Sequence, residues 1–180
     1  MGESTLQISC PAGTSLEVLV DTTGYVNYGP QLGKDQKGLI GVPRLNGSPL
    51  QGWEHYGLPL DDINKLQFAG GASAGDTSAG GASARKPIAG PGFYRGTFTV
   101  AQTGYTFLDM RGWGKGYVWI NGHNVGRYWS VGPQQSLFVP APWLKAGENE
   151  VIVLDLRSDG ERTLVGGTRQ IWDVPGVVEA

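Results

Sequence analysis

Short apolar segments alternate with clusters of Gly, Pro, Asn and Asp along most of the chain, and helical periodicity is almost absent. This pattern is typical of β-sandwiches and barrels, in which many short strands are joined by tight turns. It predicts an all-β fold whose strongest strands lie in the second half of the chain. These strands are expected at residues 93–100, 105–110, 115–122, 123–129, 135–140 and 149–156.

The turn at Asn121-Gly122 is the strongest hairpin signal, because both positions tolerate the positive φ angles of a tight β-turn. In the last of these strands, Val151 and Val153 face one way while Ile152 and Leu154 face the other. Apolar residues on both faces predict a central strand that is covered on both sides.

The remaining segments give weaker signals. Apolar positions alternate with polar ones at 16–20, which predicts a half-buried strand, and residues 38–45 and 52–60 are expected to be extended. A single helical turn is expected near 141–144, and a late strand at 168–174.

Residues 69–92 differ from the rest because they consist almost entirely of Gly, Ala and Ser. Few of these side chains can pack, so the segment is interpreted as a flexible surface loop or linker. Its length suggests that it joins two structural units or forms an insertion in one.

The charge pattern excludes several classes of partner. The net charge is −2, with 14 basic and 16 acidic residues mixed along the chain. No basic patch is visible, so neither nucleic acid nor a membrane is an expected partner. No apolar run approaches the ~18 residues of a membrane span. No signal peptide is recognised, and the compartment stays open, since the single cysteine, Cys10, is compatible with the cytoplasm.

Three motifs carry a family resemblance: FYRGTFTV, GWGKGYVWINGHNVGRYW and GPQQSLFVP. Together they resemble the C-terminal β-domain of family 35 glycoside hydrolases, the β-galactosidases. The earlier stretch LEVLVDTTGYVNYG is similar to a phrase in the family's preceding β-domain. The resemblance covers roughly residues 5–60 and 90–156.

The resemblance implies a galactose-binding-like jelly-roll β-sandwich that follows a (β/α)8 barrel. The family's two catalytic glutamates belong to that barrel, which needs about 250 residues and has no counterpart in this sequence. We expect residues 1–49 to resemble the end of a preceding β-domain. These residues either have lost their opening strands or are merged into the sandwich at 50–180.

Aromatic residues are the candidate sugar contacts. The resemblance implies that Tyr28, in the motif NYG, contacts the sugar in an active site supplied by another segment. Family members often have Arg in place of Tyr25, so the local charge differs here. Exposed aromatic rings stack on the apolar face of sugars, which makes Trp113 and Trp129, next to turns, the candidate substrate-binding residues. Sandwich packing is the alternative for each, and Trp119, inside a strand, is expected in the core.

Polar residues offer no clear catalytic or metal site. Arg127 is expected to pair with Asp109 or Asp155 and so to join two strands. No spacing identifies a pair of catalytic carboxylates, so the catalytic residues stay unknown. With two histidines and one cysteine, no zinc site and no cofactor are expected, although a calcium site of loop oxygens stays open.

Three functional hypotheses follow. The favoured one is a non-catalytic, carbohydrate-associated module of a β-galactosidase-like protein that binds β-galactosides or related carbohydrates. The alternative is a small stand-alone glycoside hydrolase whose β-galactosidase activity comes from a carboxylate pair on the sandwich. The third is a chain that needs a separate catalytic chain, or a second copy of itself, to complete a site. Whether the chain is an enzyme is therefore open.

Overall fold

The computed structural model describes residues 5–11, 13–68, 90–157 and 162–173. Contacts divide the chain into two compact units, Met1–Leu58 and Pro59–Ala180. Most of the Gly/Ala/Ser-rich segment expected to be flexible, residues 69–89, lies outside the described residues.

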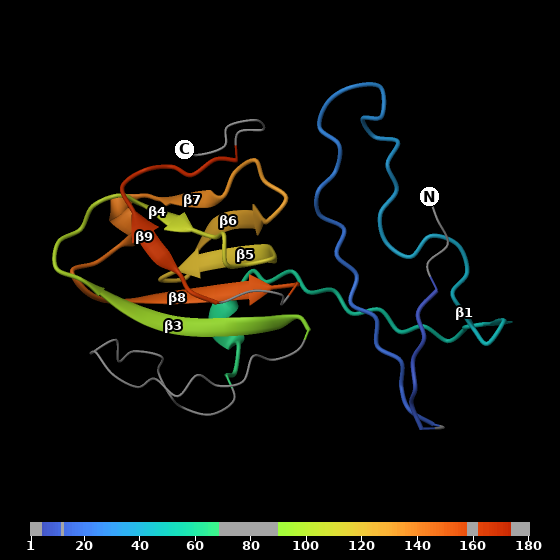
Figure 1. Cartoon of the computed structure of the whole chain (residues 1–180). Coiled ribbons are helices and arrows are strands. Elements are labelled where there is room, and N and C mark those ends of the chain that lie inside the picture. The colour runs from blue at the N-terminus through green and yellow to red at the C-terminus, as the bar shows by residue number, and fades with distance from the viewer. Residues whose placement is uncertain (1–4, 12, 69–89, 158–161, 174–180) are drawn as a thin grey trace. The chain divides into compact units, whose positions relative to one another are not determined.

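The second unit is a β-sandwich of two antiparallel sheets (Figure 1). One sheet has four strands in the order β3-β8-β5-β6, and the other has three in the order β7-β4-β9. The four-stranded sheet contains β3 (Gly92–Val100), β8 (Gly147–Asp155), β5 (Lys115–Ile120) and β6 (His123–Trp129). The three-stranded sheet contains β7 (Ser136–Val139), β4 (Thr106–Asp109) and β9 (Val165–Gly167). The described residues contain no α-helix, which confirms the all-β prediction.

The core lies between the two sheets. Alternate residues of β5 and β8, such as Val118 and Val153, pack there against Leu108 and Val139 of the three-stranded sheet. The side chains of Val118 and Val139 are completely buried. The sandwich therefore forms because each sheet presents one apolar face to the other.

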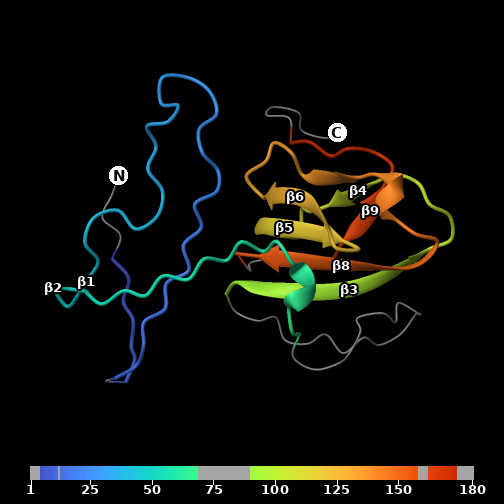
Figure 2. The same ribbon diagram turned by 180° about the vertical axis from the view of Figure 1, so that it is seen from behind.

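A second apolar cluster covers the opposite face of the four-stranded sheet. Trp119, Ile152 and Leu154 pack there around Ile63. Ile63 begins η1 (Ile63–Lys65), a 3-10 turn whose first residues are capped by the carboxylate of Asp62. This turn is the short green coil beside β3 and β8 in Figure 2. The buried position of Trp119 and the central, doubly covered β8 confirm two predictions from the sequence.

The β5–β6 hairpin turns at the predicted Asn121-Gly122 pair. Asn121 has a φ of 47° and Gly122 a φ of 82°, the left-handed values that this two-residue turn requires. The side-chain amide of Asn121 donates to the Trp143 carbonyl and to Asn149 Oδ1, each at 2.8 Å. The backbone N–H of Glu150 donates to Asn121 Oδ1 at 3.0 Å, so the turn is tied directly to β8.

Asn149 completes this polar network from inside the protein. Its side chain is fully buried, and all four of its hydrogen-bonding positions are used. The oxygen accepts from Asn121 and from the backbone N–H of Lys145, and the amide donates to the carbonyls of Lys145 and Gly147. Only an amide has this combination of donors and acceptors.

Several expected strands in the first unit are not formed. Residues 16–20 are not in a strand, and Leu16, Val18 and Val20 are exposed. Within 38–60 the only regular pairing is the two-residue ladder of β1 (Arg44–Leu45) with β2 (Ser48–Pro49). Alternating side chains make a strand only where a neighbouring strand accepts its hydrogen bonds. The described part of this unit supplies no such neighbour for 16–20.

The end of the chain also differs from the prediction. The last strand that the structure describes, β9, lies at Val165–Gly167, before the expected segment 168–174. In the described part of that segment, residues 168–173, the ladder pairing is a single isolated bridge between Trp172 and Gln134. The expected helical turn is present as the 3-10 turn η2 (Ala141–Trp143).

Gly116 provides a first test of the packing. A Cβ at this position would collide with the Leu154 carbonyl oxygen and lie 2.9 Å from the Tyr128 hydroxyl. That hydroxyl donates to the same carbonyl at 2.9 Å. We expect Gly116→Ala to lower the free energy of unfolding by about 2 kcal/mol or more, measured by urea denaturation. Gly96→Ala, whose Cβ would be 3.6 Å from Val151, is the matched control and should change it by less than about 1 kcal/mol. Equal effects at both positions would contradict this interpretation.

Asn149 provides a second test. Asn149→Asp keeps the shape but replaces two donors with a carboxylate that faces two backbone carbonyls. We expect a loss of about 3 kcal/mol in the free energy of unfolding at neutral pH. Asn124→Asp, at an exposed position on β6, is the control and should cost little. A stable Asn149→Asp protein would show that the network is dispensable.

Candidate functional site

The outer face of the three-stranded sheet carries the candidate site. Along β4, Leu108 points into the core, so Phe107 and Asp109 point to the opposite, outer face. The neighbouring strands place Ser136 and Val165 directly beside Asp109. This face is therefore composed partly of charged and partly of apolar side chains.

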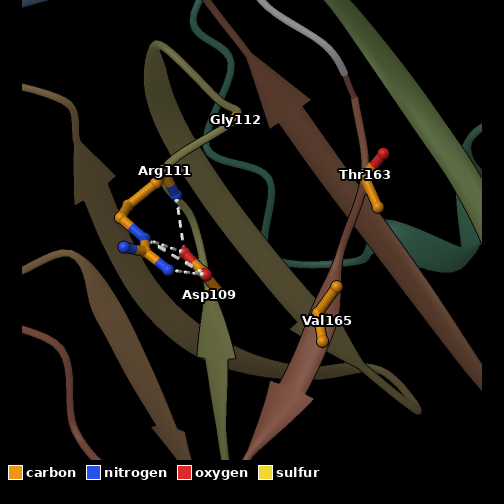
Figure 3. Close-up of a pocket in the computed structure, with 5 residues that line it drawn as sticks. All are labelled: Asp109, Arg111, Gly112, Thr163 and Val165. Carbon is orange, nitrogen blue, oxygen red and sulfur yellow. Dashed lines mark hydrogen bonds and ion pairs between the residues drawn. The ribbon is translucent and has the colours of Figure 1, made fainter.

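An open hollow of about 340 Å³ lies at the end of β4 (Figure 3). Asp109 closes the strand, and Arg111 and Gly112 follow it in the turn. Thr163 and Val165 line the other side, from the segment that leads into β9. The hollow therefore brings together residues that are more than fifty positions apart in the sequence.

Asp109 and Arg111 form a two-pronged ion pair at this hollow. Arg111 Nε donates to Asp109 Oδ1 at 3.0 Å, and its Nη2 donates to Oδ2 at 2.8 Å. The backbone N–H of Arg111 also donates to Oδ1, at 3.0 Å. These hydrogen bonds lower the pKa of Asp109 below its ordinary value of 3.8, and they outweigh the opposing effect of partial burial.

The pair offers hydrogen-bonding groups of both kinds. An ionised carboxylate accepts hydrogen bonds, whereas a guanidinium donates them. A hydroxyl group can bind to either, because it donates and accepts. A general acid needs a pKa raised toward neutrality, and the pKa of Asp109 is shifted the other way. The hollow is therefore suited to binding hydroxylated ligands rather than to protonating a leaving group.

Trp113, predicted as a sugar platform, lies in the core between the sheets. Only 5% of its surface is exposed, and its ring makes edge-to-face contacts with Tyr94 and Tyr128. Its indole N–H donates to the carbonyl of Thr163 at 3.0 Å. Thr163 lines the hollow, so this hydrogen bond fixes the backbone on one side of the hollow from within the core. The ring of Trp113 itself presents no face to solvent.

Trp129 lies on a different surface. Its neighbour Tyr128 belongs to the core, so Trp129 points to the outer face of the four-stranded sheet. It is half-buried, with Lys115 Nζ 4.3 Å and the Arg127 guanidinium 5.5 Å from its ring centroid. The two cations occupy space over the ring that a stacked sugar would need. Tyr28 belongs to the first unit, and 89% of its surface is exposed.

Arg127 does not make the ion pair expected from the sequence. Asp109 pairs with Arg111 instead, and Asp155 is buried on the core side of β8, where it accepts hydrogen bonds from the backbone of Lys115 and Arg157. Arg127 faces the opposite side of the four-stranded sheet, so neither carboxylate is within its reach.

The described part of the chain has neither a metal-binding cluster nor a membrane-spanning helix. No group of three or more His, Cys, Asp or Glu side chains there could hold a metal ion. Nor does any helix in the described ranges have the length and apolar character needed to cross a membrane.

Comparison with known proteins connects both units to one family. Residues 91–149 match the model of the β-galactosidase galactose-binding domain, and residues 2–60 match that of the β-galactosidase first all-β domain. The chain belongs to the family 35 β-galactosidases, as part of their non-catalytic C-terminal β-domains.

Individual β-galactosidases align along most of the chain. It is 39% identical to human β-galactosidase-1-like protein 2 over 163 residues, which is 90% of this chain and 23% of that protein. It is 39% identical to the bovine β-galactosidase and 36% identical to Arabidopsis thaliana β-galactosidase 17, and covers 24% and 22% of their lengths. The chain thus spans about a quarter of these curated relatives.

Sequence reasoning did not single out the Asp109–Arg111 pair of this β-galactosidase domain. From the sequence, Asp109 was expected only as one of two possible partners of Arg127, the other being Asp155. The available signal was the Asp-x-Arg spacing at the end of a strand, where the backbone turns and both side chains meet. Thr163 and Val165 carried no signal, because only the fold brings them to the hollow.

The ion pair makes a testable prediction about pH. Because Arg111 lowers the pKa of Asp109, we expect Arg111→Met to raise that pKa toward 3.8, measured by NMR titration of the carboxyl carbon. A carboxyl with a lowered pKa stabilises the fold above its unfolded pKa, and this contribution is lost as the pH falls through the folded value. The wild-type protein should therefore lose more stability below pH ~4 than the Arg111→Met protein does.

The control is Arg44→Met in the first unit, where the guanidinium donates to the Gly47 carbonyl. It should leave the pKa of Asp109 unchanged. An Asp109 pKa that is indifferent to Arg111→Met would mean that the pair does not persist in solution.

Proposed function

We propose that the chain is a carbohydrate-binding module of a β-galactosidase-like protein and that β-galactosides bind at the Asp109–Arg111 hollow. The observation that carries the proposal is the position of this pair within residues 91–149, the segment that matches the galactose-binding domain. Charged donors and acceptors at an open hollow suit a neutral ligand with many hydroxyl groups.

The open shape of the hollow implies weak binding. A hexose has about 12 non-hydrogen atoms, and roughly 0.3 kcal/mol per atom corresponds to a dissociation constant of about 2 mM. An affinity of this order suits a module that acts together with a larger protein.

The hydrolase alternative has less support. Glycoside hydrolysis needs two carboxyl groups, about 5–5.5 Å or 6.5–9.5 Å apart, one of which has a raised pKa. Asp109 is the one carboxylate among the five residues lining the hollow, and its pKa is lowered.

The third hypothesis, that the chain needs a separate catalytic chain to complete a site, is supported by a different observation. The first unit exposes many apolar side chains, which is unusual for a surface that faces only water. They include Leu16, Leu19, Val20, Leu39, Ile40 and Val42. We propose that this unit packs against a separate catalytic segment, in which case Tyr28 is free to contact a ligand there.

The experiment that tests sugar binding is an NMR titration of the ¹⁵N-labelled chain with methyl β-galactoside. We expect shifts at residues 109–112 and 163–165 and a dissociation constant of about 2 mM. Asp109→Asn should weaken binding about tenfold, because a charged acceptor is lost. Glu17→Gln, at an exposed acid of the first unit, is the control and should bind normally.

Hydrolysis of a chromogenic β-galactoside is measured on the same proteins. We expect no turnover. Turnover abolished by replacement of a single carboxylate would support the hydrolase instead, and the absence of binding with no shifts at the hollow would contradict the proposed module.

A further inference from the structure

Next to the hollow, three aromatic rings form a cluster on the same sheet. The ring centroids of Phe107 and Phe138 are 5.4 Å apart, and Tyr105 lies 6.2 Å from Phe107 and 6.1 Å from Phe138. We call Tyr105, Phe107 and Phe138 the aromatic patch. None of these three residues was predicted from the sequence, which gave Tyr28, Trp113 and Trp129 as the candidate sugar contacts.

The aromatic patch is open to solvent. Tyr105 is 62% and Phe138 50% exposed, although the other face of the same sheet is packed into the core. Contacts among the three rings thus leave at least half of two of them uncovered. Exposed aromatic surface gathered in one place marks a binding surface more often than scattered apolar residues do.

Strand register makes the patch continuous with the Asp109–Arg111 hollow. Phe107 and Asp109 point to the same face of β4 and are two positions, or about 7 Å, apart along the strand. Phe138 lies directly opposite Phe107 on β7, and on the other side Phe107 is opposite Gly167 of β9. Because Gly167 has no side chain, β9 places no side chain directly beside Phe107 at this position.

The geometry points to an oligosaccharide site in which one sugar unit binds at the hollow and a second stacks on the aromatic patch. The inference rests on the proposed function and makes its ligand more specific, since a single sugar would use only part of this surface. A pyranose has a C–H face that packs on aromatic rings and a rim of hydroxyl groups that bind charged or polar groups. Two positions along the strand span about 7 Å, so the hollow and the nearest ring of the aromatic patch are close enough to bind neighbouring units of one oligosaccharide.

The ion pair favours a glycan over an apolar protein surface as the occupant. A protein surface packed over the patch would also take Asp109 and Arg111 out of water, at a cost that an apolar partner cannot repay. A glycan supplies hydroxyl groups to the pair and C–H groups to the rings. The charged and aromatic parts of this face therefore suit the same ligand.

The test compares galactose with β-1,4-linked galactobiose and galactotriose, titrated into the whole 180-residue chain and followed by NMR. We expect galactobiose to bind at least fivefold more tightly than galactose. Phe138→Ala and Tyr105→Ala should each remove most of that gain while they change galactose affinity less than twofold. Tyr56→Ala, which removes an exposed ring from the first unit, is the control and should retain the gain. Thermal denaturation of each variant establishes that it is folded.

The possible results separate this inference from the proposed function. If the wild-type chain binds galactose but gains nothing from a second unit, or if both ring variants retain the gain, the oligosaccharide site is overturned and the module remains. If no sugar binds, the oligosaccharide site and the proposed carbohydrate-binding module are both contradicted. If Phe138→Ala instead abolishes self-association seen in sedimentation, the patch is an interface between copies of the chain, and the inference is wrong.

Discussion

Strand β8 is the element on which the rest of the sandwich depends, because it is buried on both faces. Val153 packs into the core between the sheets, while Ile152 and Leu154 pack under the turn at Ile63. A strand with two apolar faces must pair on both edges, and β8 pairs with β3 and β5. The buried side chain of Asn149 and the backbone N–H of Glu150 join its start to Asn121 in the β5–β6 turn, so a shifted register would break both of these hydrogen bonds.

Both faces of the four-stranded sheet are packed against apolar clusters. The proposed sugar site therefore lies on the smaller sheet. The inner face of β4 is held by the core, and on its outer face Phe107 and Asp109 are partly exposed. Asp109 is therefore fixed in position by a well-packed strand and yet accessible to a ligand. The indole N–H of the buried Trp113 donates to the carbonyl of Thr163, which lines the hollow, so this hydrogen bond connects the core to the site.

The apolar patterns predicted the sandwich well because its strands follow local rules. Alternation located β3 to β8, and Asn121-Gly122 located the hairpin, since only certain residues adopt that turn. The same rule failed at residues 16–20, where alternation is present but no described strand pairs with the segment. Alternation shows that a segment can form a strand, and a pairing partner decides whether it does.

By itself the sequence determined the all-β class, the central strand, the hairpin and the resemblance to the β-galactosidases. These depend on local spacing and on motifs that the chain carries in continuous stretches. Only the tertiary structure decided which aromatic residues are exposed, because exposure depends on what packs against a side chain from far along the chain. It buried Trp113, set Lys115 and Arg127 over Trp129, and left Tyr105 and Phe138 exposed on the sheet that carries the Asp109–Arg111 pair.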